Sequence, residues 1–194
     1  MKITAPDFDA LPPPFGKREL EYLTFQTEMG WVGILASANG LLATTLPHPS
    51  AEAARQMLGD AVSQAEWVTH RLADLAERIK AYFSGKKVNF PDEFDLSGFT
   101  TFQRQVWLQT RLIPYGETRS YSWVAEQIGK PRATRAVGQA LGKNPLPIIV
   151  PCHRVVASDG GLGGFSGGLE MKRKLLEVEG CLSRETLRYA QGDS

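Results

Sequence analysis

The residues with the most evident chemistry lie in the run IIVPCHRVV, residues 148–156. Cys152 is one of two cysteines in the chain, and His153 and Arg154 follow it directly. A cysteine reacts as its thiolate, which a neighbouring base or cation favours. Because side chains adjacent in sequence often point apart, we expect a bridging water as readily as direct contact between the thiol and His153. The motif makes Cys152 a candidate nucleophile; a buried structural cysteine is the competing interpretation.

A histidine that acts as a base usually has a carboxylate on its other ring nitrogen. Glu126, Glu177 and Glu179 could each fill this position, and the local pattern does not choose among them. The three histidines are scattered, and no CxxC or HxxxH pair is present, so we expect no bound metal. Two cysteines also make a disulfide framework improbable and fit a reducing compartment.

The segment after the motif, residues 160–168, contains six glycines. Glycine lets another surface approach the backbone closely, at a cost in conformational entropy. The segment is either a flexible connector or, given its place between Cys152 and an amphipathic stretch, one wall of a pocket for a flat ligand.

The net charge of +1 conceals an uneven distribution along the chain. Residues 1–100 carry nine Lys and Arg against thirteen Asp and Glu, whereas residues 101–180 carry eleven against six. Between Glu126 and Asp159 there are five basic residues and no acidic one. Such a block is either a solvated face or a surface that binds phosphates.

The composition is that of a globular protein, with 42% hydrophobic and 22% charged residues in a chain of 194. The N-terminal segment lacks the apolar region of a signal peptide, and no stretch approaches the roughly 20 apolar residues of a membrane span. We therefore expect a cytoplasmic protein with no membrane partner.

Two lobes are predicted from the change in pattern along the chain. Residues 20–47 are rich in aromatic and β-branched residues and are broken at Gly30 and at Asn39-Gly40, which predicts three short antiparallel strands. Residues 50–62 and 69–85 have helical periodicity, with Gly85 as a stop signal. The polar, proline-interrupted stretch 86–100 is the predicted linker. We place the lobes at residues 1–95 and 96–194.

The second lobe is predicted to be mostly helical. One helix is expected over residues 100–113, and a second begins after Ser120, a good N-cap, and ends at Gly129. A third is expected from Lys130, with Pro131 in its first turn. The last two helices with a tight turn between them match a helix-turn-helix, which places Arg132 and Arg135 near the start of its second helix. A helical hairpin without DNA contacts is the alternative.

The chain from FQRQVW to LEVEG, roughly residues 101–180, resembles the O6-alkylguanine-DNA alkyltransferase family, and PCHRV before a glycine-rich loop is the most specific part of the match. The resemblance implies an α+β protein: an N-terminal lobe with a small antiparallel sheet and helices of the ribonuclease-H-like kind, and a mostly helical C-terminal domain with a helix-turn-helix. It implies irreversible, single-turnover transfer of the alkyl group from O6-alkylguanine, and from O4-alkylthymine, to the protein's own cysteine.

The resemblance also implies the catalytic roles. Cys152 would accept the alkyl group, and His153, oriented by Glu179, would take the thiol proton through a water. Tyr121 would help to protonate the leaving base and would crowd the backbone phosphate so that the nucleotide rotates out. Asn144 would brace the turn that carries the site.

For DNA binding, the resemblance implies that Arg135 enters the base stack through the minor groove. Ser166 would hydrogen-bond the guanine and Lys172 would support the loop. The other residues implied along the DNA are Gln103, Tyr121, Ser122, Lys130 and Ser158, and those implied around the base are Val155, Phe165, Ser166, Lys172 and Pro147. Two positions depart from the family pattern: Phe165 stands where some members have tyrosine, and Ser122 where glutamine is frequent.

The implied partner is double-stranded DNA containing alkylated guanine. The protein is expected to be a monomer in solution, to bind either alone or cooperatively along the duplex, to need no cofactor and, in a prokaryote, to associate with the nucleoid. Three other functions compete. A lesion binder that transfers nothing would lack the cysteine; a transcription regulator would need a helix richer in base-reading side chains than RATRAVGQALG. A papain-like hydrolase would need a catalytic histidine far from the cysteine in sequence.

Overall fold

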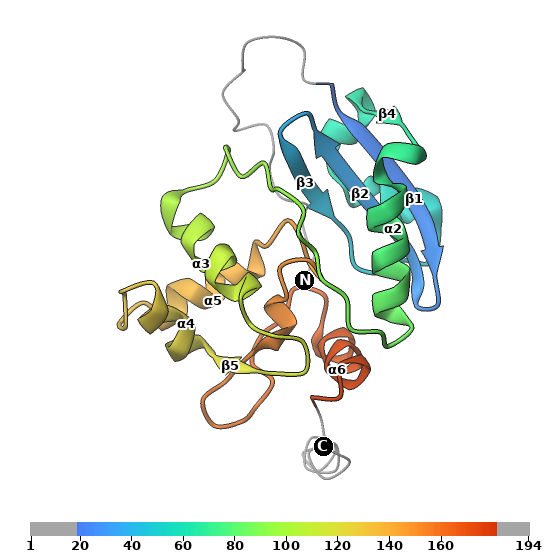
Figure 1. The fold of residues 1–194 in the computed structure, drawn as a ribbon. Coiled ribbons are helices and arrows are strands. Elements are labelled where there is room, and N and C mark those ends of the chain that lie inside the picture. The colour runs from blue at the N-terminus through green and yellow to red at the C-terminus, as the bar shows by residue number, and fades with distance from the viewer. Residues whose placement is uncertain (1–18, 182–194) are drawn as a thin grey trace.

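A computed structural model describes residues 19–181 of the chain. The N-terminal segment, with its expected lack of a signal peptide, and the tail after residue 181 lie outside the described residues. Figure 1 shows a twisted sheet with a long helix across one face, and a group of shorter helices on the other side of the molecule. This mixed α+β architecture confirms the predicted fold class.

The sheet has four strands in the order β3-β2-β1-β4. The predicted antiparallel strands are all present, as β1 (Glu21–Thr27), β2 (Gly30–Ser37) and β3 (Gly40–Thr44). The fourth strand, β4 (Glu66–Trp67), pairs parallel with β1 and was not predicted, because two residues are too few to show an alternating pattern.

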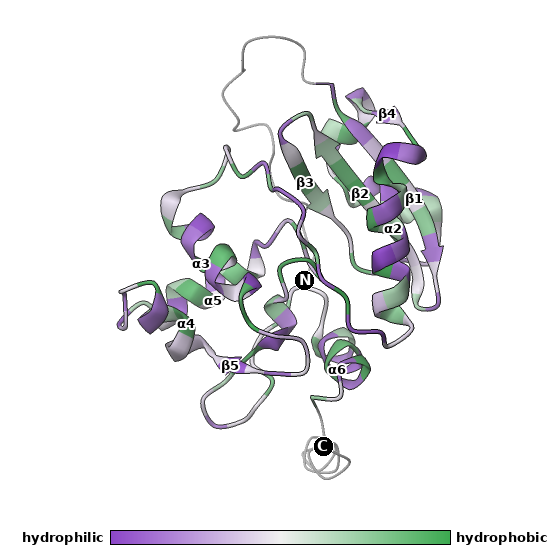
Figure 2. Cartoon of the chain, in the orientation of Figure 1, coloured by the Kyte–Doolittle hydropathy of each residue, from purple (hydrophilic) through white to green (hydrophobic). Residues whose placement is uncertain are grey.

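Both faces of the sheet are covered. Alternate residues of a strand point to opposite faces, and one face packs against α2 (His70–Phe83), whose apolar residues recur three and four apart. Figure 2 shows the hydrophilic side of α2 turned away from the sheet. The other face packs against α1 (Ala51–Gln56) and the 3-10 helix η2 (Asp60–Gln64).

One expected helix is shorter than predicted. The pattern over residues 50–62 predicts a single helix, but α1 ends at Gln56. Gly59 adopts a φ of 86°, a left-handed conformation that interrupts the helix before η2 begins. The predicted stop of α2 at Gly85 is confirmed, with a φ of 80°.

The second half is mostly helical, as predicted. α3 (Thr101–Arg111) begins with a capping box between Thr100 and Gln103. α4 (Tyr121–Gln127) is capped by the Ser120 side chain, as expected, and packs against α5 (Thr134–Gly142).

The start of α5 differs from the prediction. Pro131 and Arg132 lie in the turn before the helix and not in its first turn. Gly129, with a φ of 69°, closes α4 with the hydrogen bond from Lys130 N to Ala125 O, and a further turn ends with Ala133 N on Lys130 O. Residues 128–133 therefore form the turn between the end of α4 and the start of α5.

Two short elements connect the candidate nucleophile to α4. The 3-10 helix η3 (Cys152–Arg154) is followed by β6 (Val155–Val156), which pairs parallel with β5 (Arg119–Ser120). Neither strand was predicted. Since Tyr121 follows β5 directly, this pairing brings Tyr121 close to the chain around Cys152. The glycine-rich segment then leads into α6 (Leu169–Val178).

One buried core extends from the sheet through the helices of the second half. Trp107 is fully buried, and its indole N–H donates to the carbonyl of Ala140 at 2.9 Å, which joins α3 to α5. The division into lobes at residues 95 and 96 stays a prediction. None of the helices between residues 19 and 181 has the length and apolar character needed to cross a bilayer.

The end of β3 holds the loop that precedes Cys152. The backbone N–H of Thr44 donates to Pro145 O at 2.9 Å, and its hydroxyl donates to Pro147 O at 2.9 Å. Within this loop Ile148 adopts a φ of 77°, a conformation that costs a β-branched residue about 1–3 kcal/mol. The sheet therefore supplies contacts that keep a strained turn in place.

Replacing Thr44 by Val tests this anchoring. Val keeps the shape of the side chain but leaves the Pro147 carbonyl without its buried donor, which costs about 1–3 kcal/mol. We expect urea denaturation of Thr44→Val to give a lower free energy of unfolding by that amount. Thr101→Val, at an exposed position of α3, is the control and should change it by less than about 0.5 kcal/mol. Equal effects of the two substitutions would contradict the anchoring.

Candidate active site

Cys152 is held at the base of the turn 144–151 and is 5% exposed. Asn144 organises this turn: its side-chain N–H donates to Val150 O at 2.9 Å and to the Cys152 Sγ at 3.1 Å, and its oxygen accepts from Leu146 N at 3.0 Å. Because one amide side chain holds both the backbone and the sulfur, the position of the thiol is fixed by the turn.

The thiol experiences opposing electrostatic effects. Burial raises the pKa of Cys152, while the hydrogen bond from Asn144 and the nearby Lys172 ammonium oppose that rise. The net direction is upward, so the resting group is the neutral thiol. A base is then needed for it to react as a thiolate.

His153 is completely buried, and its side chain meets Glu179 at the end of α6. The Nε2 atom lies 2.7 Å from Glu179 Oε1. Of the three carboxylates that the sequence left open, the structure brings Glu179 to this histidine. The other ring nitrogen, Nδ1, is buried and has no hydrogen-bond partner among residues 19–181. That nitrogen is free to accept a proton.

Glu179 is the centre of a buried polar network. Arg154 binds it with two donors, Nε to Oε2 at 2.8 Å and Nη2 to Oε1 at 3.0 Å. The hydroxyl of Tyr82 donates to Oε1 at 2.7 Å, and Gly116 N donates to Oε2 at 3.2 Å. The donors of this network lie in α2, in the loop after α3 and in η3, whereas Glu179 lies at the end of α6. The network therefore connects several separate segments of the chain.

These contacts determine which groups are ionised. Burial alone would raise the pKa of Glu179, but hydrogen bonds from His153 and Arg154 outweigh it and lower the pKa to about 2. Burial lowers the pKa of His153, an effect that outweighs the attraction of Glu179. At neutral pH the pair is a carboxylate beside a neutral imidazole, in which Nε2 carries the proton that Oε1 accepts.

Lys172 ties the glycine-rich loop to the chain after Cys152. Its completely buried ammonium donates to the backbone carbonyls of Val155 at 2.6 Å and Gly164 at 3.2 Å, and also to that of Leu162. Burial lowers the pKa of Lys172 to about 8, and a thiolate at Cys152 opposes that shift. The ammonium therefore both shapes the loop and favours negative charge on the sulfur.

Tyr121 and the loop fit closely together. The Tyr121 hydroxyl donates to Gly164 O at 3.0 Å, and a Cβ at Gly163 would lie 2.7 Å from the tyrosine ring. Gly163 also has a φ of 66°. Only glycine fits both the close approach of the Tyr121 ring and the left-handed backbone conformation, which explains the glycine at position 163 of the glycine-rich segment.

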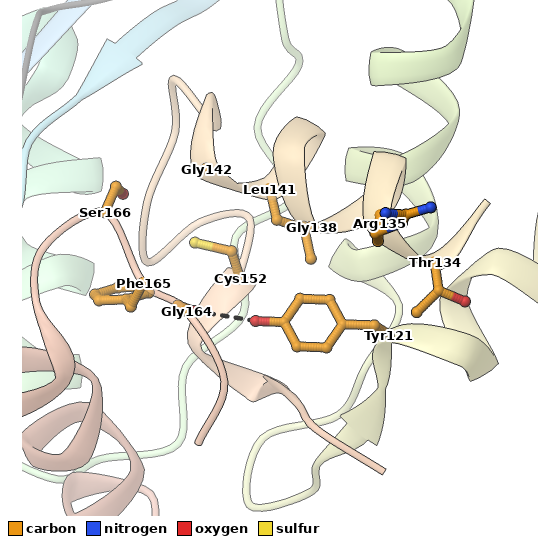
Figure 3. Close-up of a pocket in the computed structure, with 10 residues that line it drawn as sticks. All are labelled: Tyr121, Thr134, Arg135, Gly138, Leu141, Gly142, Cys152, Gly164, Phe165 and Ser166. Carbon is orange, nitrogen blue, oxygen red and sulfur yellow. Dashed lines mark hydrogen bonds between the residues drawn. The ribbon is translucent and has the colours of Figure 1, made fainter. Parts of the chain in front are cut away.

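Cys152 opens into a pocket of about 530 Å³, within the range of small-ligand sites. Figure 3 shows Cys152 between Phe165 and Ser166 on one side and Tyr121 on the other. The pocket is lined by Tyr121, Thr134, Arg135, Gly138, Leu141, Gly142, Cys152, Gly164, Phe165 and Ser166.

The structure places the remaining predicted residues away from the lining. Val155 is buried and its carbonyl accepts from Lys172, and Pro147 contributes the carbonyl bound by Thr44. Ser122 and Ser158 lie together, with their hydroxyls 3.3 Å apart. Gln103 closes the cap of α3, and the Lys130 ammonium lies 5.6 Å from the Phe102 ring.

Several residues of the site were missed at the sequence level. Thr134, Gly138, Leu141 and Gly142 line the pocket because they share one side of α5, a relation that a helical periodicity could have suggested. Tyr82 lies on the apolar stripe of α2, where its spacing marks it as a core residue and gives no sign of a polar contact. Among the described residues, no group of His, Cys, Asp and Glu side chains is arranged to hold a metal ion.

Fold and site together are those of an α+β protein with a candidate cysteine nucleophile in a pocket beside a pair of short helices. Residues 101–181 match the family model described as 6-O-methylguanine DNA methyltransferase, DNA binding domain. The methylated-DNA–protein-cysteine methyltransferase of Mycobacterium leprae is 49% identical over 119 residues, which cover 60% of this chain and 72% of the relative. The chain belongs to this family of methyltransferases.

Other comparisons extend the similarity. The enzyme of the same name from Mycolicibacterium paratuberculosis is 53% identical over 107 residues, which span 55% of this chain and 64% of that relative's length. The crystal structure of Mycobacterium tuberculosis OGT in complex with DNA has 38% sequence identity and a TM-score of 0.70, and covers 82% of this chain and 92% of that one. The structural match includes the sheet, which the family model does not cover.

The buried network predicts an acid-sensitive fold. The folded-state pKa of Glu179 lies below the ordinary value of 4.5, so its stabilisation is complete above pH 4.5 and is lost as the pH falls towards 2. The shift corresponds to about 3 kcal/mol. The pKa of His153 is also lowered, so the unfolded chain binds a proton at this histidine more readily than the folded chain does. This further decreases the free energy of unfolding below pH 6.5.

Urea denaturation at a series of pH values checks this expectation. We expect Glu179→Gln to flatten the decline in the free energy of unfolding below pH 4.5, while Glu177→Gln, an exposed neighbour, keeps the wild-type slope. A wild-type slope in Glu179→Gln would show that acid lability originates elsewhere.

Proposed function

We propose that the protein repairs alkylated DNA by transferring the alkyl group from O6 of guanine, and from O4 of thymine, to the sulfur of Cys152. The observation that carries the proposal is the environment of the Cys152 thiol, which lines an open pocket and accepts a hydrogen bond from Asn144. The next residue, His153, has its Nε2 atom hydrogen-bonded to the Glu179 carboxylate. The names of the relatives support the same reaction.

The transfer is an in-line displacement at the alkyl carbon. The sulfur–carbon bond forms as the carbon–O6 bond breaks, and the electron pair of that bond remains on the guanine. The thiol proton passes through a water to His153 Nδ1, while the guanine takes a proton from Tyr121, which regains one through solvent from His153. The net products are S-alkyl cysteine and unmodified guanine.

Each side chain has a physical reason for its proposed part. The neutral imidazole has its lone pair on Nδ1, because Nε2–H is directed to Glu179. Burial and the nearby Cys152 raise the pKa of Tyr121, so its hydroxyl remains protonated and able to donate. Lys172 favours the transient thiolate, and Ser166, which lines the pocket, is proposed to hydrogen-bond the base.

DNA binding is assigned to α4, the turn 128–133 and α5, acting as a helix-turn-helix. An O6-alkyl group is not accessible inside a duplex, so the nucleotide must leave the stack, at a cost of a few kcal/mol. Arg135 is exposed at the mouth of the pocket, where it can take the place of the extruded base. The small residues Ala136 and Gly138 beside it allow α5 to enter a narrow minor groove. Gln103, Ser122, Lys130 and Ser158 are proposed to follow the backbone.

The reaction ends with the product on the protein. A thioether sulfur is a very poor leaving group, and no residue of the described site offers a route to reverse the transfer. Each molecule therefore acts once. We propose that the protein is a monomer in solution and needs no cofactor.

Peptide mass spectrometry after incubation with a duplex containing one O6-methylguanine tests the proposal. Trypsin releases Cys152 in the peptide NPLPIIVPCHR, residues 144–154, and Cys181 in a different peptide. We expect the first peptide to gain the mass of one methylene, in a 1:1 ratio with the protein, and Cys152→Ala to gain nothing. Binding of the lesion duplex with an unmodified Cys152 would instead identify a damage sensor.

Replacing Arg135 by Ala distinguishes a role in extruding the nucleotide from a role in the alkyl transfer itself. The variant should transfer methyl groups from duplex DNA at least about tenfold more slowly, a loss of about 1.4 kcal/mol, because the vacated space in the stack is no longer filled. Transfer from the free O6-methylguanine base, which needs no extrusion, should keep the wild-type rate. Lys87→Ala, which removes one exposed positive charge from the linker, is the control. Equal losses on both substrates would contradict this role for Arg135.

A further inference from the structure

The proposed function assigns no part to Tyr82, a buried side chain that contacts both His153 and Glu179. Tyr82 lies on α2, in the N-terminal half, and is completely buried. Its hydroxyl donates to Glu179 Oε1 at 2.7 Å and lies 3.2 Å from His153 Nε2. Figure 1 shows the C-terminal end of α2 above α6, the helix that leads to Glu179. The first half of the chain therefore reaches the histidine–carboxylate pair.

The direction of each hydrogen bond follows from the ionisation of Glu179. An ionised carboxylate can only accept, so both Tyr82 O–H and His153 Nε2–H must donate to Oε1. The Tyr82 hydroxyl has a single proton, which it donates in the hydrogen bond to Oε1. Its oxygen can therefore only act as an acceptor toward His153, from Nε2–H. The imidazole N–H is thus directed between two acceptors, Glu179 Oε1 and the Tyr82 oxygen.

Two acceptors restrain the imidazole more than one does. A single carboxylate oxygen fixes the tautomer but allows the ring to tilt about the N–H···O direction. A second acceptor on a different element restricts that tilt, and with it the direction of the lone pair on Nδ1. Proton transfer depends steeply on such geometry.

The Tyr82 ring is itself firmly held. It makes edge-to-face contacts with Phe83, Phe90 and Tyr115, at centroid distances of 5.4, 6.4 and 6.2 Å. These contacts come from α2, from the linker and from the loop after α3. The hydroxyl is therefore a rigid reference point for the two groups that it contacts.

We propose that Tyr82 is a positioning residue for alkyl transfer, which aligns the His153 imidazole and the Glu179 carboxylate from the N-terminal half of the molecule. The inference rests on the proposed function, since it assigns His153 the part of base. It makes α2 a component of the reactive site in addition to a cover for the sheet.

Tyr82→Phe is the direct test, because it keeps the ring and removes only the hydroxyl. Tyr115→Phe is the matched control: it removes a hydroxyl from the neighbouring ring, where the partners are the backbone carbonyls of Val178 and Gly85. Single-turnover transfer from an O6-methylguanine duplex is measured over a range of DNA concentrations. In parallel, ¹⁵N and ¹H NMR of the DNA-free protein reports the tautomer and the exchange of His153 Nε2–H.

For Tyr82→Phe we expect the maximal transfer rate to fall about tenfold, with no change in the DNA concentration that gives half the maximal rate. The Nε2–H resonance should exchange faster and the second tautomer should become detectable. Tyr115→Phe should retain the wild-type maximal rate and the wild-type imidazole spectrum. A wild-type rate and spectrum in Tyr82→Phe would overturn the proposal, as would the same losses in both variants.

The wild-type protein decides the question if Tyr82→Phe does not fold. A slowly exchanging Tyr82 hydroxyl proton with a nuclear Overhauser effect to His153 Nε2–H supports the arrangement, and its absence overturns it. These spectra need no DNA. A wild-type protein that leaves Cys152 unmodified would therefore refute the proposed transfer, while the spectra still establish whether Tyr82 aligns the imidazole.

Discussion

The structure depends on a carboxylate that remains charged in a buried position. Glu179 accepts five hydrogen bonds, from His153, Tyr82, Gly116 and twice from Arg154. A buried charge without partners would be very unfavourable, so each of these donors stabilises the folded chain. They come from α2, from the loop after α3 and from η3, and thus the same charge that orients the histidine also holds the two halves of the molecule in register.

The thiol of Cys152 presents the opposite problem. Burial favours the neutral thiol, which is a weak nucleophile, while the proposed transfer requires negative charge on the sulfur. The site compensates locally, with the Asn144 amide on the sulfur and the Lys172 ammonium nearby. Lys172 in turn donates to the carbonyls of Leu162 and Gly164 in the glycine-rich loop and to that of Val155 in β6. The loop, the lysine and the cysteine therefore form one electrostatic unit, although they are separated in sequence.

Local patterns in the sequence were sufficient to predict some features of the structure and gave no indication of others. Residue types and local spacing were sufficient for the three strands and for the Ser120 cap, and they made Cys152 a candidate nucleophile, because each leaves a signal within a few residues. The choice of Glu179 over Glu126 and Glu177 came from a family resemblance, since a contact between His153 and a residue 26 positions away leaves no local pattern. Tyr82 was missed for a related reason: on an apolar helical stripe, a tyrosine with a buried hydroxyl partner has the same spacing as one that only packs. The late start of α5 and the short β5–β6 pair were missed because both depend on backbone hydrogen bonds that any residue can make.

The anchoring of the turn before Cys152 bears on which part of the chain is a complete unit. Ile148 holds its left-handed conformation while Thr44 of β3 binds the carbonyls on either side of Leu146, and Leu46 packs against Gly167 in the pocket loop. Both of these contacts, and that of Tyr82, come from before residue 101, where the family model begins. A chain beginning at residue 101 would retain every side chain drawn in Figure 3 and would still lack the supports that shape the site. The segment that the family model matches is therefore shorter than the segment that forms a complete site. We expect the two halves of the chain to be exchanged between relatives only as a pair.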